Sequence, residues 1–183
     1  MTTSTALLTD RYELTMLAAA LRDGTASRPS VFELFSRRLS GGRRFGVVAG
    51  TGRLLTLLRQ FRFDDDELRF LRDNDVVDAD SLTYLENYRF TGSIRGYREG
   101  ELYFPGSPIL TVEGTFADAV VLETLALSVL NHDSAVATAA SRMSIAAGER
   151  PLAEMGSRRA AEQSAVAAAR AAYIAGFGAT SNL

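Results

Sequence analysis

Two adjacent arginines near the end of the chain are the side chains best suited to bind an anion. Arg158 and Arg159 follow a short, mostly apolar segment, Leu152–Met155, which has the composition of a buried strand. Gly156 allows a sharp turn, and Ser157 can cap the helix that follows. Guanidinium groups match carboxylates and phosphates in shape and charge, so this sequence predicts a small anion site. The alternative is that both arginines simply point into solvent.

A β-α-β unit would have to position these arginines. Ala160–Ala175 consists almost entirely of good helix formers with small residues along one face, and Gly176 stands where a C-terminal cap is expected. Phe177–Leu183 has the composition of the opening of a second strand. Since α/β folds bind ligands where strands end and helices begin, we expect the anion site at the carboxyl end of the first strand.

The composition excludes several kinds of chemistry. The chain has 183 residues, 46% hydrophobic, which is enough for one good core. Its net charge of −2 implies no general attraction to nucleic acid or to a membrane. With no cysteine and one histidine, thiol catalysis, disulfides and His-rich metal sites are excluded. All 20 basic residues are arginine, so lysine Schiff-base chemistry is excluded as well. The absence of a long apolar stretch and of a signal pattern predicts a cytoplasmic protein.

A helix is expected near the N-terminus, with Thr9 or Asp10 as its N-cap. Its apolar stripe consists of Leu14, Leu17 and Leu21. Tyr12 can be an ordinary residue of this amphipathic helix, or it can offer an aromatic face to a flat ligand. The pattern leaves both interpretations open.

The next segments predict strands, loops and short helices. Val31–Leu39 alternates as a strand covered on both faces, and Val47–Leu58 leads into a helix. Between them, Gly41–Arg44 could cradle a phosphate, but it lacks the lysine and the strand-loop-helix order of a P-loop, which favours an ordinary loop. Asp64–Glu67 could bind a divalent metal, although such a run more commonly begins a helix, here Leu68–Asn74.

The middle of the chain changes periodicity twice. A short helix with Leu82, Leu85 and Tyr88 facing inward is expected within residues 75–88. Residues 90–114 then follow a period of two, with a turn at Pro105-Gly106. Residues 116–147 return to helical spacing, with a break expected at residues 131–134 and Asp133 or Ser134 as a new N-cap. His132 invites a catalytic role, and a structural role at the helix junction is the alternative.

Four segments together resemble nicotinate phosphoribosyltransferase of the type found in actinobacteria. They are Glu154–Arg159 with its Ala-rich helix, Thr9–Met16, the strand Phe32–Arg38, and Phe104–Pro108. The resemblance covers essentially the whole chain. It implies an α/β fold class, with an α+β N-terminal domain over residues 1–115. Residues 116–183 would form a linking helix and the first β-α-β unit of a type II phosphoribosyltransferase α/β barrel, which is truncated here.

The resemblance also implies an activity. Nicotinate phosphoribosyltransferases join nicotinate to 5-phosphoribosyl-1-pyrophosphate with coupled ATP hydrolysis, usually with Mg²⁺, and they serve NAD salvage as dimers that share their active sites. Tyr12 would stack on the pyridine ring in the partner subunit, and Arg158 would contact the anion beside that ring. Arg37 would approach phosphate groups. The other residues expected to line the site are Asp10, Ser157 and Arg159.

Two departures from the family pattern stand out. Family members are more than twice this length, and the phosphorylated histidine and the other catalytic groups are expected downstream of Leu183. Ala161 stands where close relatives tend to carry histidine. We therefore expect the isolated chain to be inactive and poorly soluble. The alternatives are a non-catalytic dimerisation or regulatory fragment, and an enzyme that uses nicotinamide or quinolinate.

Overall fold

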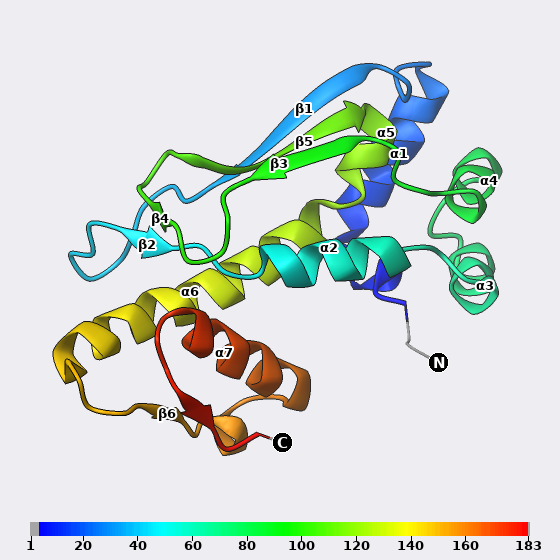
Figure 1. Cartoon of the computed structure of the whole chain (residues 1–183). Helices are drawn as coiled ribbons and strands as arrows, with labels where there is room; N and C mark the ends of the chain where they lie inside the picture. The colour runs from blue at the N-terminus through cyan, green and yellow to red at the C-terminus, as the bar shows by residue number, and fades with distance from the viewer. Residues whose placement is uncertain (1–3, 183) are drawn as a thin grey trace. The chain divides into compact units, whose positions relative to one another are not determined.

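A computed structural model of the chain describes residues 4–182 and shows a mixed arrangement of helices and strands (Figure 1). The elements, in chain order, are η1 (Ala6–Leu8), α1 (Arg11–Arg22), β1 (Pro29–Phe35), β2 (Gly46–Val47), α2 (Thr51–Gln60), α3 (Asp65–Asp73), α4 (Ala79–Glu86), β3 (Ser93–Gly96), β4 (Leu102–Tyr103), β5 (Pro108–Thr115), α5 (Phe116–Val120), α6 (Glu123–Ala147), β6 (Ala153–Glu154), η2 (Ser157–Arg159), α7 (Glu162–Ile174) and β7 (Ala179–Thr180). Within residues 4–182, no helix combines the length and the hydropathy needed to cross a bilayer.

The chain forms two compact units. The first comprises the residues up to Glu33, Leu55–Arg95 and Leu110–Leu127. The second comprises Leu34–Leu54, Gly96–Ile109 and the residues from Ser128 onward. The boundary that the sequence suggests after residue 115 remains a prediction.

In the first unit, helix α1 packs against α4 and α5, and α3 packs against α4 (Figure 1). The expected apolar stripe of α1 is largely buried, since Leu14 and Leu17 are inaccessible to solvent. Three aromatic rings pack edge to face in this unit with centroids 5.7–6.3 Å apart, a favoured geometry for aromatic pairs. They belong to Phe61, Phe63 and Tyr88.

The acidic run before α3 caps that helix. The Asp64 carboxylate accepts a hydrogen bond from the Glu67 amide at 2.9 Å, and the Glu67 carboxylate accepts one from the Asp64 amide at 2.9 Å. This reciprocal arrangement satisfies backbone donors that the first turn of a helix leaves free. Asp78 caps α4 in a similar way through the Ser81 amide. The run that begins at Asp64 therefore starts a helix, as its sequence favours.

A three-stranded sheet has the order β1-β5-β3, and most of its residues belong to the first unit. The prediction that β1 is covered on both faces is wrong. Its residues alternate between exposed and half-buried, with Val31 63% and Phe35 47% exposed. β1 lies at an edge of the sheet and only one of its faces is packed, so apolar side chains on the other face meet solvent.

In the second unit, β2 and β4 pair antiparallel, with Gly46 opposite Tyr103 and Val47 opposite Leu102. Val48, Tyr103 and Ile109 form a buried cluster beside this pair. The turn predicted at Pro105-Gly106 is present between β4 and β5. The helix predicted within Val47–Leu58 begins at Thr51, because residues 46–47 form β2 first.

Helix α6 is continuous, and the break predicted at residues 131–134 is wrong. Asp133 and Ser134 are buried inside this 25-residue helix and do not cap a new one. Their side chains bond to distant segments instead: Ser134 Oγ accepts from the Ala49 amide and donates to the Ala49 carbonyl, both at 3.1 Å. Tertiary partners therefore satisfy polar groups that would otherwise favour a helix start.

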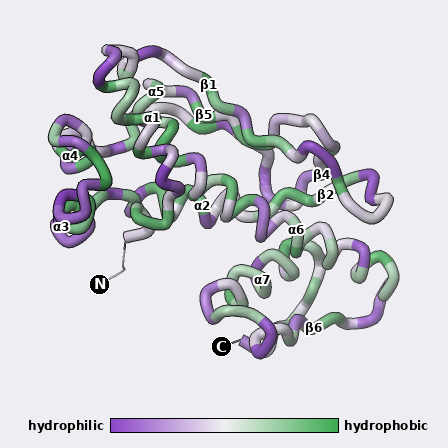
Figure 2. Tube along the Cα trace, turned by 180° about the vertical axis from the view of Figure 1, so that it is seen from behind, coloured by the Kyte–Doolittle hydropathy of each residue, from purple (hydrophilic) through white to green (hydrophobic). Residues whose placement is uncertain are grey.

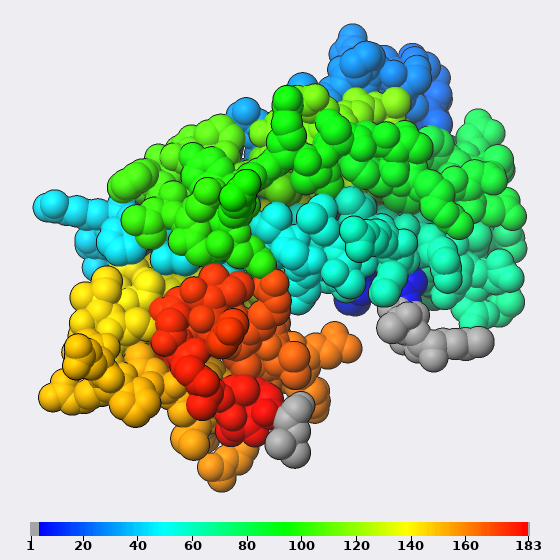
Figure 3. All heavy atoms as spheres, in the orientation of Figure 1, coloured from blue at the N-terminus to red at the C-terminus, as the bar shows by residue number. Residues whose placement is uncertain are grey.

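The predicted β-α-β unit is present at the end of the chain, but the prediction that its first strand is buried over Leu152–Met155 is wrong: β6 comprises Ala153–Glu154 only, Ala153 is exposed and Met155 is 73% exposed. β6 and β7 pair in parallel, with Ala153 opposite Ala179 and Glu154 opposite Thr180. Helix α7 connects them and packs its alanines against α6, whose Ala137 and Ala140 are buried in the same clusters. Figure 2 shows both helices largely in pale green, the colour of mildly hydrophobic residues, and Figure 3 shows the atoms of α7 and β7 as one close-packed group. Small side chains let the two helix backbones approach closely.

Candidate functional site

Arg158 and Arg159 lie directly after β6, at its carboxyl end, in the single 3₁₀ turn η2. Both side chains are exposed. The Arg159 amide donates to the Gly156 carbonyl at 2.8 Å, which closes the turn. The turn fixes the backbone that carries the two arginines, and their guanidinium groups are open to solvent. This exposure is compatible with an anion site and with the alternative that both arginines simply point into solvent.

A hydrogen-bond network fixes the turn that carries these arginines. Glu154, the last residue of β6, accepts from the Gly156 amide at 2.5 Å and from Thr180 Oγ1 at 3.1 Å. Ser157 Oγ donates to Asn182 Oδ1 at 2.8 Å. The ends of the two parallel strands are thus cross-linked by side chains, and the position of the turn depends on residues at both ends.

The prediction that Ser157 caps the following helix is wrong. Ser157 begins η2, and α7 starts only at Glu162, with Ala161 at the N-cap position and no side-chain hydrogen bond there. An alanine side chain cannot accept a bond from the free amides of the first turn. The Ser157 hydroxyl instead donates to Asn182 after β7, and this bond holds Ser157 next to Arg158 in the candidate site.

Asp10 and Tyr12 lie at the start of α1 in the first unit. Asp10 occupies the N-cap position, as predicted, although its carboxylate makes no capping hydrogen bond. The Tyr12 side chain is 43% exposed. The Glu123 carboxylate near its hydroxyl is the main reason why the pKa of Tyr12 is raised above its ordinary value. The phenol stays protonated at neutral pH, and part of its ring is open to solvent.

Arg37 lies in the bend after β1, and its side chain is exposed. The glycine-rich segment that follows, residues 41–44, is a loop, as its sequence favours. Gly41 and Gly42 have φ of 65° and 70°, a region that glycine enters without strain. Arg37 can therefore reach a ligand, while its binding role stays a prediction.

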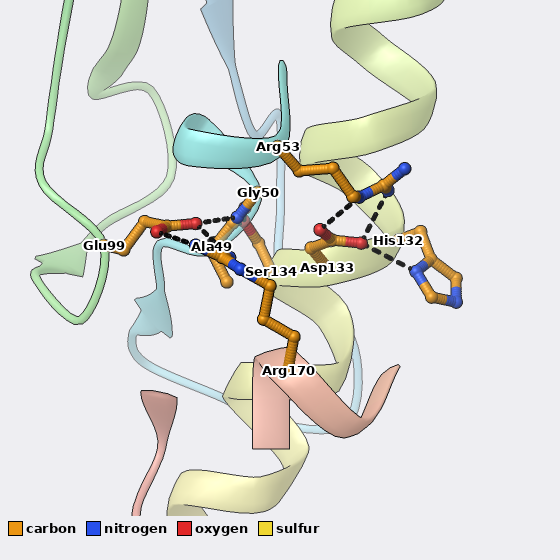
Figure 4. Close-up of polar contacts among 8 residues, drawn as sticks. All are labelled: Ala49, Gly50, Arg53, Glu99, His132, Asp133, Ser134 and Arg170. Atoms are coloured by element: carbon orange, nitrogen blue, oxygen red, sulfur yellow. Dashed lines mark hydrogen bonds and ion pairs between the residues drawn. The ribbon is translucent and has the colours of Figure 1, made fainter. Parts of the chain in front are cut away.

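Two carboxylates organise the second unit (Figure 4): Glu99, which the sequence does not mark, and Asp133, for which it indicates a capping role instead. Glu99 accepts the Gly50 amide at 2.7 Å and both Arg170 terminal nitrogens at 2.6 Å. The bond to Arg170 is the main reason why the pKa of Glu99 lies below its ordinary value. Glu99 therefore ties α7 to the backbone just before α2, from a loop between β3 and β4.

Asp133 is the second of these carboxylates, and only 1% of its side chain is exposed. It accepts two hydrogen bonds from Arg53, at 2.9 Å and 2.8 Å, and lies 2.9 Å from His132 Nδ1 (Figure 4). Gly50 lies against it with φ of 99°, and a Cβ there would come within 3.1 Å of Asp133 and the Val129 carbonyl. His132 thus contacts a buried ion pair, in agreement with a structural role.

The structure groups the predicted residues by unit. Asp10 and Tyr12 lie together at the start of α1, and Ser157, Arg158 and Arg159 lie together after β6. The Gly50 and Arg170 partners of Glu99 and the Arg53 partner of Asp133 lie 49 or more residues away in sequence, so no local pattern marks these bonds. Among residues 4–182, no group of three or more His, Asp or Glu side chains is arranged to hold a metal ion.

Solved structures of known proteins share this fold. The crystal structure of human nicotinic acid phosphoribosyltransferase matches 95% of this chain, and 36% of its own, with a TM-score of 0.87 and 35% identity. Nicotinate-nucleotide pyrophosphorylase from Pyrococcus furiosus matches 97% of this chain and 38% of its own, with a TM-score of 0.75 and 25% identity. The fold is thus that of the N-terminal part of pyridine phosphoribosyltransferases.

Sequence comparison identifies the family. The profile of the nicotinate phosphoribosyltransferase (NAPRTase) N-terminal domain matches residues 7–131. Nicotinate phosphoribosyltransferase pncB1 of Mycobacterium tuberculosis is 66% identical over 177 residues, which are 97% of this chain and 39% of that protein. The human enzyme is 38% identical over 97% of this chain and 34% of its own length. The chain belongs to the nicotinate phosphoribosyltransferase family, and it spans less than two fifths of the length of these relatives.

Proposed function

We propose that this chain forms the N-terminal part of an enzyme that joins nicotinate to 5-phosphoribosyl-1-pyrophosphate for NAD salvage. In this reaction the pyridine nitrogen forms a bond to C1′ of the ribose, while the bond from C1′ to pyrophosphate breaks. The products are nicotinate mononucleotide and pyrophosphate. The family match over residues 7–131, together with a relative that is 66% identical, carries the proposal.

Arg158 is the proposed partner of the nicotinate carboxylate. It is exposed at the carboxyl end of β6, on a turn that Glu154 holds in place. A guanidinium here neutralises the carboxylate and fixes the direction of the pyridine ring, which places its nitrogen toward C1′. Arg159 and Ser157 line the same turn, and Arg37 would contact phosphate groups of the second substrate.

Tyr12 is the proposed aromatic face for the pyridine ring, with Asp10 beside it. Its ring is partly exposed, and its hydroxyl lies near the Glu123 carboxylate at the start of α6. The ring would serve the active site of a partner subunit in a homodimer. An electron-poor pyridine stacks favourably on a tyrosine ring, which supports this assignment.

The complete enzyme would be cytoplasmic and would couple the reaction to ATP hydrolysis in the presence of Mg²⁺. No group of acidic or histidine side chains suited to a metal occurs within residues 4–182, so no step is assigned to Mg²⁺ on residues of this chain. What this chain's residues contribute is recognition of the pyridine and neutralisation of its carboxylate.

A substrate panel on the full-length gene product tests the proposal. We expect turnover of nicotinate and little turnover of nicotinamide, because an amide offers Arg158 no negative charge to neutralise. Arg158→Ala should lower kcat/KM for nicotinate by about 100-fold, since the charged ligand group loses its hydrogen-bonded partner. Preference for quinolinate or nicotinamide would favour a relative with another substrate. If the folded wild-type protein turns over none of the three substrates, a non-catalytic dimerisation or regulatory role is favoured.

A further inference from the structure

The first two residues of α6 interact with both of the residues proposed to serve the pyridine site from the first unit. The Asp10 amide donates to Thr124 Oγ1 at 3.2 Å. The Glu123 carboxylate lies near the Tyr12 hydroxyl and is the main cause of the raised pKa of that phenol. Hydrogen bonds of Thr124 with Asp10 and with Glu13 fix the start of α1 to the start of α6, across 114 and 111 residues of sequence.

Glu13 lies at the centre of this contact and is fully buried. One oxygen of its carboxylate accepts the Thr124 amide at 2.9 Å and also the Thr124 hydroxyl, and the other accepts the Thr9 hydroxyl. Because Thr124 is the second residue of α6, the carboxylate satisfies a free amide in the first turn of that helix and interacts favourably with its dipole. Glu13 thus caps a helix to which it does not belong.

Thr124 connects these bonds into one chain. Its hydroxyl accepts from the Asp10 amide and donates to Glu13, so the backbone of Asp10 and the side chain of Glu13 are fixed by the same oxygen. Tyr12 lies between these two residues in sequence. Thr124 therefore fixes the backbone on one side of Tyr12 and the Glu13 side chain on the other, while 43% of the Tyr12 side chain remains open to solvent.

Burying the Glu13 carboxylate costs free energy, so a contribution to packing alone does not explain why a carboxylate occupies this position. A buried carboxylate without a cation is expensive, and burial raises the pKa of Glu13. The carboxylate of Glu123 at the start of α6 raises it further. The donors that reach Glu13 within residues 4–182 are hydroxyl and amide groups. An apolar residue would pack α1 against α6 at lower cost, but it would not fix the Thr124 hydroxyl.

We propose that Glu13 and Thr124 are positioning residues that orient the Tyr12 ring and the Asp10 backbone for the pyridine. The inference rests on the proposed function. Neither side chain touches the substrate; they act through Tyr12 and Asp10. Their loss should therefore weaken binding of the pyridine more than it slows the bond-forming step, because a displaced ring affects ground state and transition state alike.

The test measures steady-state kinetics and melting temperature of the full-length enzyme. Thr124→Val keeps the volume but removes the hydroxyl, and we expect it to raise KM for nicotinate about tenfold with kcat changed less than about twofold. KM for phosphoribosyl pyrophosphate should stay constant. Thr124→Ser restores the hydroxyl and should restore KM for nicotinate. Glu13→Gln should behave like Thr124→Val.

Thr138→Val is the matched control. Thr138 is a buried threonine of α6 in the second unit, and its hydroxyl accepts the Val47 amide at 2.8 Å. Its replacement should lower the melting temperature by an amount similar to that for Thr124→Val, without raising KM for nicotinate. This variant separates loss of a buried hydrogen bond from loss of Tyr12 orientation.

The outcomes are distinct. If Thr124→Val matches Thr138→Val in every constant while Tyr12→Ala still raises KM for nicotinate, the positioning inference is wrong and the proposed function stands. If Tyr12→Ala itself leaves KM unchanged, the assignment of Tyr12 fails and the inference fails with it. Should Glu13→Gln not fold, the comparison of Thr124→Val with Thr124→Ser decides the question alone.

Discussion

Glu99 links three parts of the second unit through one carboxylate. Glu99 lies in the loop between β3 and β4. It accepts one hydrogen bond from the Gly50 amide, just before α2, and two from the guanidinium of Arg170 on α7. Its side chain is 20% exposed and that of Arg170 is 41% exposed. Solvent therefore screens the pair in part, and its contribution to stability should be modest.

Glu99→Gln should lower the free energy of unfolding by about 1 kcal/mol at neutral pH. Arg170 holds the pKa of Glu99 below its ordinary value of 4.5, so the pair stabilises the folded state fully above that pH. This stabilisation is lost as the pH falls through the lowered pKa of the folded state. Urea unfolding of wild type and variant should therefore converge in acid. If the two proteins still differ in free energy of unfolding at acid pH, the charge of Glu99 is not the source of its contribution.

Asp133→Ala should be more damaging, because the carboxylate is buried. Its removal leaves Arg53 half-buried without its two-pronged partner, and we expect a loss of about 3 kcal/mol in the free energy of unfolding. Asp66→Ala is the control, since Asp66 forms an exposed pair with Arg69 and should cost less than about 0.5 kcal/mol. Equal losses in urea unfolding would mean that the Asp133 pair contributes no more than a surface one.

At the scale of elements, α6 supports the second unit, and its continuity can be measured. Amides 131–136 lie inside the helix and should exchange slowly with solvent, since each bonds to a carbonyl four residues earlier. Two helices separated at residues 131–134 would leave the first amides of the second helix without such partners. Hydrogen exchange followed by mass spectrometry distinguishes these cases, and fast exchange at 134–136 would contradict a continuous helix.

Local chemistry predicted several elements correctly. The carboxylates before α3, the Pro105-Gly106 turn and the strand-turn-helix order around Gly156 all depend on interactions within a few residues, which the sequence displays. The position of Arg158 and Arg159 after a strand followed from the same kind of pattern, whereas the fold class followed from the family resemblance.

The errors concern residues whose environment is set by distant segments. Asp133 and Ser134 resemble N-caps, but Arg53 and Ala49 satisfy them within a helix. Val31–Leu39 has the apolar composition of a covered strand, yet β1 lies at a sheet edge. Thr124, which bonds to Glu13, and Arg170, which bonds to Glu99, lie 111 and 71 residues away, so the neighbouring sequence does not identify these bonds.

At the scale of the whole molecule, the apolar face of β1 should make the 183-residue chain associate. Val31 and Phe35 are exposed on a strand at a sheet edge, a combination that favours pairing between chains. Val31→Lys should shift sedimentation toward the monomer at concentrations on the order of 100 μM. Val166→Lys on α7 replaces an equally exposed valine away from any sheet edge and should leave association unchanged. Equal effects of both variants would exclude a special role for β1.

The central claim is that a guanidinium after the first strand of the β-α-β unit binds the carboxylate of a pyridine. Calorimetric titration of the full-length protein with nicotinate mononucleotide tests it most directly, with Arg158→Ala as the variant and Arg150→Ala as its control. Arg150 is also exposed but precedes β6, at the opposite end of the strand. We predict that Arg158→Ala abolishes measurable binding and that Arg150→Ala binds like wild type. If Arg158→Ala binds nicotinate mononucleotide as tightly as wild type does, Arg158 is not the partner of the pyridine carboxylate.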